Sequence, residues 1–334
     1  MRKVLRSIFL VGLIACTTMM VHAGGRGAAD GQITLRLGSS MADGTVEVLA
    51  AREFGRLLEQ YSGGTMRVDV LAGGLGGAER EIVEGQQLGI MDMSVVSGIL
   101  QNFDPAMMIM EYELLFINEA HVRAVWEGPV GRQIYDRLVE TTGIRVLSML
   151  MRTPRIMTTV RPIHSADDLH GLRLRVPEMP ARLALWAALG ASPTPMAFPE
   201  VYTALQTRTI DGQENPISVI VNARFYEVAD YLAVTNHVYG FMFITIAEST
   251  YRRFTDQQRE WVNRAAAGAA RFNDAAGREV EAAELALAKQ HMTVTHPDTS
   301  GWRALTAEVY RQFLHIDGFP EFYRAIREVG RQFE

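Results

Sequence analysis

The chain has 334 residues, of which 48% are hydrophobic and 21% are charged, and its formal net charge is −5. This length allows one large or two ordinary folded domains with an ample core. The acidic excess gives no general attraction to nucleic acid or to anionic lipid. Cys16 is the only cysteine, which excludes an intrachain disulfide and a cysteine-based metal site.

Residues 1–23 have the pattern of a secretory signal peptide. Basic residues precede an apolar segment from Ile8 to Ala15, which is too short for a membrane span of about 20 apolar residues. Cleavage after Ala23 would give a soluble periplasmic protein, whereas the segment from Leu13 to Cys16 resembles a lipobox that would anchor the chain through its acylated cysteine. Both alternatives remain open, and both place the mature protein in the periplasm.

Strand and helix patterns alternate along the rest of the chain. Predicted strands cover residues 33–37, 66–71, 90–96, 146–151 and 157–160, and predicted helices cover residues 46–61, 79–87 and 180–189. Thr255 and Gln258 form a capping-box pattern, which begins a long alanine-rich helix that continues toward Gln290. This alternation predicts an α/β fold with a largely parallel sheet.

The segment from Gly190 to Pro216 places polar side chains where a helical stretch gives way to an extended one. Pro199 suits the first turn of a helix, and Asp211 with Gly212 forms a turn signal. The polar residues that follow this turn are Gln213, Glu214 and Asn215.

Four segments of the chain, in matching order and spacing, resemble the solute receptors of TRAP transporters, the DctP-like family, and most closely its sialic-acid and sugar-acid branch. They are residues 74–81, 169–177, 190–216 and 225–237. The segment 169–177 ends in the Arg-Val-Pro sequence that carries the signature arginine of the family, here Arg175. The resemblance extends from Leu35 to the end of the chain.

The resemblance implies an α/β, two-lobed periplasmic solute-binding-protein fold, with a cleft between the lobes and a long helix that spans both. Residues 31–152 with 241–277 would form lobe one, and residues 153–240 with 278–334 would form lobe two. The implied function is that of a periplasmic receptor, acting as a monomer, that captures a small organic acid. It would deliver this acid to the membrane subunits of a TRAP permease.

Arg175 is the residue that the resemblance places on the ligand carboxylate. A guanidinium is planar and always charged, and it matches a carboxylate with two parallel hydrogen bonds. Arg155 lies 20 residues before Arg175 and Asn215 lies 40 residues after it, which are the spacings of two partner residues in the sialic-acid branch. Arg152 competes with Arg155 for the role of second cation, and Glu214 would bind ligand or brace the arginines.

Other residues would shape the remainder of the cleft. Phe198 matches an aromatic residue that lines the cleft in the family, although a core position is an alternative. Tyr239, Phe241 and Phe243 would add an apolar wall. Ser39 and Ser97 would offer neutral hydrogen bonds to ligand hydroxyls.

The ligand class follows from a departure from the sialic-acid branch. Residues 94–100 lack the acidic residue and the arginine that this branch uses to recognise sialic acid. A sugar acid is therefore favoured, with a C4-dicarboxylate or a 2-oxo or hydroxy acid as alternatives. Glu111 and Glu113 interrupt a segment that is apolar in the family, and the sequence offers no account of them.

An enzymatic function has little support in the sequence. Gly74 and Gly76 follow a strand as in a dinucleotide fingerprint, but Glu79 stands where the third glycine belongs. The chain contains no Gly-x-Ser-x-Gly nucleophile elbow and no His-Glu-x-x-His zinc motif. We therefore expect no catalysis, cofactor, metal or nucleic-acid partner. A receptor that reports its ligand to a membrane sensor remains an alternative to transport.

Overall fold

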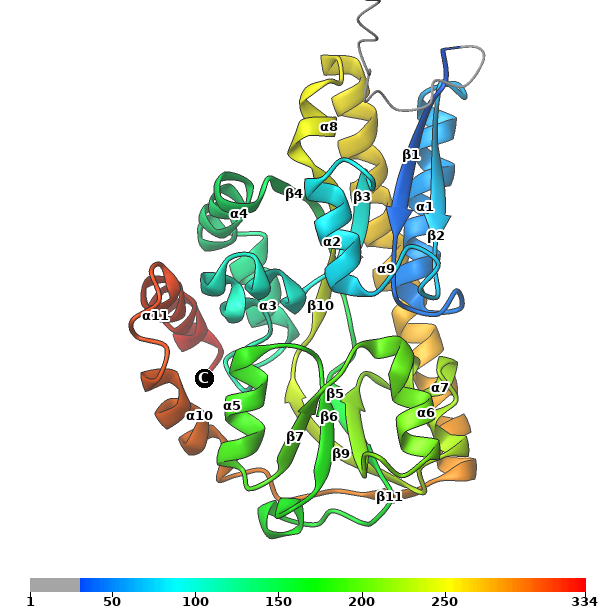
Figure 1. Cartoon of the computed structure of the whole chain (residues 1–334). Helices are drawn as coiled ribbons and strands as arrows, with labels where there is room; N and C mark the ends of the chain where they lie inside the picture. Colours follow the sequence, from blue (N-terminus) through cyan, green and yellow to red (C-terminus); the bar gives the residue numbers. More distant parts are fainter. Residues whose placement is uncertain (1–30) are drawn as a thin grey trace, which may run out of the picture.

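The computed structural model describes residues 31–334, without the side chains of residues 303 and 305–307. The predicted signal peptide and Cys16 lie outside these residues. Two β-sheets, each covered by helices, form two lobes, drawn one above the other in Figure 1. No helix within residues 31–334 is long and apolar enough to cross a bilayer.

Lobe one is built on a five-stranded sheet of order β2-β1-β3-β10-β4. Its strands are β1 (Ile33–Gly38), β2 (Met66–Leu71), β3 (Met93–Val96), β4 (Ile144–Met151) and β10 (Phe241–Ala247). The helices that accompany these strands in sequence are α1 (Val46–Tyr61), α2 (Glu79–Gln87), α3 (Glu119–Trp126), α4 (Pro129–Thr142) and α8 (Glu248–Arg252). Two 3-10 helices, η1 (Gly98–Asn102) and η2 (Pro105–Glu111), follow β3.

Lobe two is built on a six-stranded sheet of order β11-β9-β5-β8-β6-β7. Its strands are β5 (Arg155–Thr159), β6 (Arg173–Val176), β7 (Ser192–Pro195), β8 (Gly212–Asn215), β9 (Tyr231–Val238) and β11 (Thr293–Thr295). The intervening helices are α5 (Pro180–Ala188), α6 (Val201–Gln206) and α7 (Ile217–Asn222), with 3-10 segments η3 (Ala166–Leu169), η4 (Phe198–Glu200) and η5 (Phe225–Glu227).

Both sheets are largely parallel, as predicted, and each contains one strand that runs against the others. In lobe one, β1 pairs in parallel with β2 and β3, but β10 runs antiparallel to β3 and β4. In lobe two, β6 is parallel to β7 and β8, whereas β5 is antiparallel to β8 and β9. Strand β10 is antiparallel because it enters the first sheet directly from the other lobe, without the crossover helix that a parallel neighbour requires.

Helix α9 (Asp256–His291) spans both lobes, as the resemblance implies. The capping box is present: the Gln258 N–H donates to Thr255 Oγ1 at 3.2 Å, and the Thr255 N–H donates to Gln258 Oε1 at 2.9 Å. The helix packs against α1 and β4 in lobe one and against α7 in lobe two. It therefore ties the two lobes together along one side of the molecule.

Two short linkers also join the sheets, one from β4 to β5 and the other from β9 to β10. They contact each other, because the Arg152 N–H donates to the Gly240 carbonyl at 3.1 Å. After β11, helix α10 (Trp302–Arg311) packs on α5, and α11 (Phe319–Gly330) packs on α3 and α4 before a final 3-10 segment, η6 (Arg331–Phe333). The residue boundaries of the lobes given above remain a proposal.

Large apolar side chains fix the lobes around the cleft. Trp186 on α5 packs edge to face on Trp302 of α10, with ring centroids 5.6 Å apart, and both are fully buried. Trp126 packs on Phe241 and Phe243 at 4.9 and 5.5 Å. Each such side chain contributes about 1.5–3 kcal/mol on burial, so the strands that carry the site residues rest on a rigid base.

Candidate functional site

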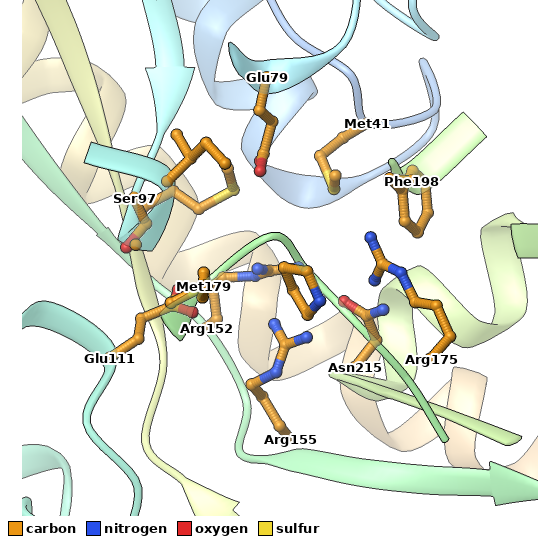
Figure 2. A pocket seen from close by; sticks show the side chains of 14 residues that line it. Met41, Glu79, Ser97, Glu111, Arg152, Arg155, Arg175, Met179, Phe198 and Asn215 are labelled. Carbon is orange, nitrogen blue, oxygen red and sulfur yellow. The ribbon is translucent and has the colours of Figure 1, made fainter. Parts of the chain in front are cut away.

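A cavity lies between the two sheets, with a volume of about 380 Å³ including its open mouth. Figure 2 shows its lining. The lining residues are Met41, Glu79, Ser97, Gly98, Ile99, Glu111, Arg152, Arg155, Arg175, Pro177, Met179, Phe198, Asn215 and Met242. Several of them follow the carboxyl ends of strands, which is where open α/β sheets bind ligands.

The sheet register brings Arg155, Arg175 and Asn215 to one edge of lobe two. Strand β8 lies between β5 and β6; Ile156 on β5 is opposite Asn215, and Arg175 on β6 is opposite Gln213. Because β5 runs antiparallel to β8 and β6 runs parallel to it, the start of β5 and the ends of the other two strands share an edge. Arg155, 20 residues before Arg175, and Asn215, 40 residues after it, thus meet Arg175 at one cavity.

Arg175 is buried, with 3% of its surface exposed, and yet it forms no ion pair within residues 31–334. Its Nε and Nη2 donate to the Met196 carbonyl at 3.0 and 2.7 Å, and no hydrogen bond to Nη1 is found in this part of the chain. Burial lowers the pKa of Arg175 to about 10, because the negative charges of Glu214 and Glu79 oppose this shift only in part and the positive charge of Arg155 adds to it. The site therefore holds a cation that has no ion-pair partner among the residues that the structure describes.

Phe198 and Asn215 flank this arginine (Figure 2). The guanidinium carbon of Arg175 lies 5.9 Å from the centroid of the Phe198 ring, which lines the cavity and also contacts two core clusters. Asn215 Nδ2 donates to Gln213 Oε1 at 2.7 Å, and Gln213 Nε2 donates to Thr158 Oγ1 at 2.8 Å. Gln213 thus orients the asparagine.

Arg155 is held by Glu214 and does not need a ligand to balance its charge. Its Nε and Nη2 contact the two carboxylate oxygens of Glu214, and Nη2 also donates to the Glu214 carbonyl at 2.7 Å. Burial disfavours the ionised carboxylate, but Arg155 and Arg182 hold the pKa of Glu214 well below its ordinary value. Glu214 does not line the cavity. It fixes the orientation of Arg155, so that the Nη1 group of Arg155 is left to contact a ligand in the cavity.

His237 adds a further contact to Glu214, with Nε2 at 3.0 Å from Oε2 and Nδ1 at 2.8 Å from Thr235 Oγ1. Burial lowers the pKa of His237, although Glu214 opposes this shift, so the ring is neutral at pH 7. A neutral ring that donates to Glu214 orients the carboxylate without adding charge.

Arg152, the competing second cation, also lines the cavity, from the linker between β4 and β5. Its Nε lies 2.6 Å from Glu47 Oε1 on α1, and both side chains are at most 4% exposed. This ion pair joins the linker to lobe one, so Arg152 enters the cavity as half of a neutral pair. Both candidates therefore face the cleft, with different partners.

Arg182 on α5 was not anticipated, and it accounts for the two glutamates that the sequence left unexplained. Pro180 begins this helix, and Arg182 is fully buried beneath the cleft. Its Nε lies 2.8 Å from Glu113 Oε1, Nη2 lies 3.1 Å from Glu111 Oε2, and Nη1 donates to Glu214 Oε1 at 3.0 Å. Acidic residues in an apolar segment were the available signal, because a buried carboxylate demands a buried cation.

The charges of this cluster depend on one another. Burial opposes the charge on Arg182, but the carboxylates of Glu214, Glu113 and Glu111 outweigh it, and the pKa of Arg182 lies above its ordinary value. Burial raises the pKa of Glu113 to about 7 even though Arg182 favours its ionised form. The arginine therefore stays charged while Glu113 gains or loses a proton near neutral pH.

Lobe one contributes Ser97 and Glu79 to the cavity. Ser97 follows β3 and is 3% exposed, and its Oγ has no hydrogen-bond partner within the described chain. Glu79 begins α2 and was missed as a lining residue; burial and the negative charge of Glu111 raise its pKa. Ser39 does not line the cavity, because its Oγ accepts the Met41 N–H at 3.2 Å in the interior.

The predicted apolar wall differs from the observed one. Phe241 and Phe243 point into the core against Trp126, and Met242, between them on β10, lines the cavity instead. Side chains alternate between the two faces of a strand, so the prediction chose the wrong face. Two further methionines, Met41 and Met179, complete the apolar lining.

Comparison with known proteins establishes the family. Residues 37–316 match the DctP family, described as bacterial extracellular solute-binding protein, family 7. The chain is 38% identical over 261 residues to a solute-binding protein of Roseobacter denitrificans, covering 78% of this chain and 80% of that relative. The chain therefore belongs to the DctP family of extracellular solute-binding proteins, and the resemblance seen in its sequence is confirmed.

Solved structures share the fold. A TRAP periplasmic solute-binding protein of Roseobacter denitrificans with bound L-galactonate has a TM-score of 0.84 at 33% identity, covering 89% of this chain and 98% of the other. A sugar acid binding protein of Advenella mimigardefordensis in complex with galactonate has a TM-score of 0.86 at 26% identity, covering 91% and 99%. The fold is thus the two-lobed fold of TRAP solute receptors, and the protein is a binding protein, not an enzyme.

Proposed function

We propose that this protein is the periplasmic receptor of a TRAP transporter, which captures a sugar acid through an arginine–carboxylate clamp and delivers it to the membrane permease. The observation that carries the proposal is the burial of Arg175 at the cavity without an ion pair among the described residues. A buried, unpaired charge is costly. A ligand carboxylate removes this cost and accepts charge-assisted hydrogen bonds from the guanidinium.

The carboxylate would lie between Arg175 and Arg155, with Asn215 beside it. Both arginines keep Nη1 free of hydrogen bonds within residues 31–334, and both are oriented by other contacts, at the Met196 carbonyl and at Glu214. The donors are therefore preorganised, so little entropy is lost on binding. A micromolar ligand needs only about −8 kcal/mol, and charge-assisted hydrogen bonds contribute about 1.5–3 kcal/mol each.

The remaining surface of the cavity suits a polyhydroxylated ligand. The Ser97 hydroxyl has no hydrogen-bond partner among the described residues, Glu79 and Glu111 supply oxygens that can accept hydrogen bonds, and Phe198 supplies an aromatic face. Sugar acids also occupy both solved relatives described above, which hold L-galactonate and galactonate. Both considerations favour a sugar acid as the ligand of this protein.

The lobes meet across the mouth of the cavity. Arg80 at the start of α2 lies 3.5 Å from Glu178 of lobe two, and Asn102 Nδ2 donates to the Glu178 carbonyl at 2.8 Å. These contacts suit a closed form, in which the ligand is sequestered between the lobes. We propose that the permease recognises this form, that the receptor acts as a monomer, and that its signal peptide delivers it to the periplasm.

The test is ligand binding by mature protein that has been refolded from denaturant to remove carried-over ligand. Thermal shifts with galactonate, galacturonate and erythronate are compared with those of the neutral polyols galactitol and erythritol. A ligand at 100 times its Kd adds about 2.7 kcal/mol to the free energy of unfolding. Stabilisation by the acids alone supports the clamp, whereas stabilisation by the neutral compounds alone would overturn it.

Substitution of Arg175 tests the clamp directly. Arg175→Ala should weaken acid binding by about 3–5 kcal/mol, at least a hundredfold, because the ligand carboxylate is left buried without its partner. The matched control is Arg173→Ala, which lies two residues earlier on β6 and pairs with Asp211 at the surface. Near-normal affinity in Arg175→Ala, measured by calorimetry, would contradict the proposal.

A further inference from the structure

The two ends of the cavity differ in charge. In Figure 2, Arg175 and Asn215 lie at one side, and Glu111 and Ser97 lie at the opposite side. Arg175 has no acidic partner among the residues that the structure describes, so its side of the cavity is positive. A ligand that binds across the cavity therefore meets two different environments at its two ends.

The carboxylate of Glu111 is fixed at the wall of the cavity. Its Oε2 lies 3.1 Å from Arg182 Nη2, and no hydrogen bond to its Oε1 is found within residues 31–334. A Cβ atom added to Gly98 would lie 3.3 Å from Oε2, so the carboxylate packs against the segment that begins at Ser97. A carboxylate oxygen and the Ser97 hydroxyl, neither of which has a hydrogen-bond partner in the described part of the chain, thus share this wall.

The charges around Glu111 do not cancel once Glu113 is ionised. Two arginines, Arg155 and Arg182, contact three carboxylates in this cluster: Glu111, Glu113 and Glu214. Arg152 adds no net charge because it is paired with Glu47. The Glu111 side of the cavity is therefore negative when the Arg175 side is positive.

We propose that Glu111 is a specificity-determining residue that restricts the ligand to monocarboxylic sugar acids and excludes their dicarboxylic counterparts. The proposal rests on the proposed function, because it assumes that Arg175 holds one carboxylate. A hydroxyl at the far end of the ligand donates to Glu111, forming a short, charge-assisted hydrogen bond. A second carboxylate there has no proton to donate, and it meets a like charge inside a cavity of low dielectric.

Two pairs of probes isolate this effect, because each pair differs only in whether the terminal group is a hydroxymethyl or a carboxylate. They are D-galactonate with galactarate, and D-erythronate with meso-tartrate. Calorimetry is done at pH 8, above the pKa of Glu113. In whichever pair contains the tighter-binding monocarboxylate, that monocarboxylate should bind at least tenfold more tightly than its dicarboxylate counterpart. Equal or tighter binding of the dicarboxylate by the wild-type protein would overturn the proposal.

Glu111→Gln keeps the size of the side chain and removes its charge. We expect it to weaken monocarboxylate binding about tenfold and to lower the ratio of the two affinities at least tenfold. Glu308→Gln is the matched control, because it makes the same substitution at an exposed site that pairs with Arg311 and does not line the cavity, and it should change the ratio less than threefold. An unchanged ratio in a folded Glu111→Gln variant would contradict the role of Glu111.

The two proposals fail in different ways. If Arg175→Ala binds the monocarboxylate normally, the clamp itself is wrong. If Arg175→Ala abolishes binding while Glu111→Gln leaves the selectivity unchanged, the clamp stands and only the role of Glu111 is lost. The wild-type selectivity needs no variant, so the test holds even if Glu111→Gln fails to fold.

Discussion

Arg175 and Arg182 are both buried and lie only seven residues apart, yet their surroundings are opposite. Arg182 contacts three carboxylates, whereas the hydrogen bonds that Arg175 makes within residues 31–334 go to the carbonyl of Met196 alone. Burial lowers the pKa of Arg175 to about 10, while the carboxylates around Arg182 raise its pKa. The comparison teaches that a buried cation with its counter-charges inside the chain supports structure, whereas one without them indicates an absent anionic ligand.

The largest effect expected from this comparison is on stability. Arg182→Met should lower the free energy of unfolding by about 3–5 kcal/mol, because it strands three buried carboxylates. Urea unfolding of the ligand-free protein measures this loss. The control is Arg56→Met, whose pair with Glu53 is largely exposed at the arginine and should cost less than about 1 kcal/mol. Equal losses of unfolding free energy in the two variants would show that the contacts of Arg182 do not stabilise the fold.

The next effect is a pH dependence that originates in the same cluster. Burial raises the pKa of Glu113 from 4.5 to about 7, so the folded state binds this proton more tightly than the unfolded state does. The stability that this provides is complete below pH 4.5 and is lost as the pH rises through 7. The shift corresponds to about 3 kcal/mol, since each pKa unit is worth about 1.4 kcal/mol.

Glu113→Gln should remove this loss of stability between pH 4.5 and 7. Urea unfolding at several pH values measures the slope for both proteins, and other groups cancel in the difference between them. Glu308→Gln, at an exposed site paired with Arg311, controls for the change in net charge. If the wild-type protein and Glu113→Gln keep parallel pH profiles, Glu113 does not titrate in this range.

The sequence predicted the residues of lobe two better than those of lobe one. Arg155, Arg175, Phe198 and Asn215 all reach the cavity, because they lie within contiguous motifs whose strands are neighbours in one sheet. Their contacts with a ligand remain a prediction. Glu214 was correctly considered as a brace for an arginine, since residues that alternate along a strand face opposite sides.

What the sequence could not provide was the pairing between distant segments. Arg182 is 71 residues from Glu111, and only the packing of α5 beneath η2 makes them neighbours. Ser39 and Ser97 look equivalent as isolated polar residues, yet one bonds to its own loop and the other faces the cavity. Local patterns specify elements, but these differences arise from how one lobe is placed against the other.

The smallest predicted effect separates the two arginines most sharply. In the ligand-free protein, Arg175→Met should change the free energy of unfolding by less than about 1 kcal/mol. Removing an unpaired buried charge is favourable by about 1–3 kcal/mol, and leaving the Met196 carbonyl unsatisfied costs about as much. Urea unfolding of this variant beside Arg182→Met measures the contrast, since the two substitutions exchange the same side chains at equally buried sites. A loss of several kcal/mol in Arg175→Met would mean that Arg175 is structural, and the missing anion would no longer be needed to explain it.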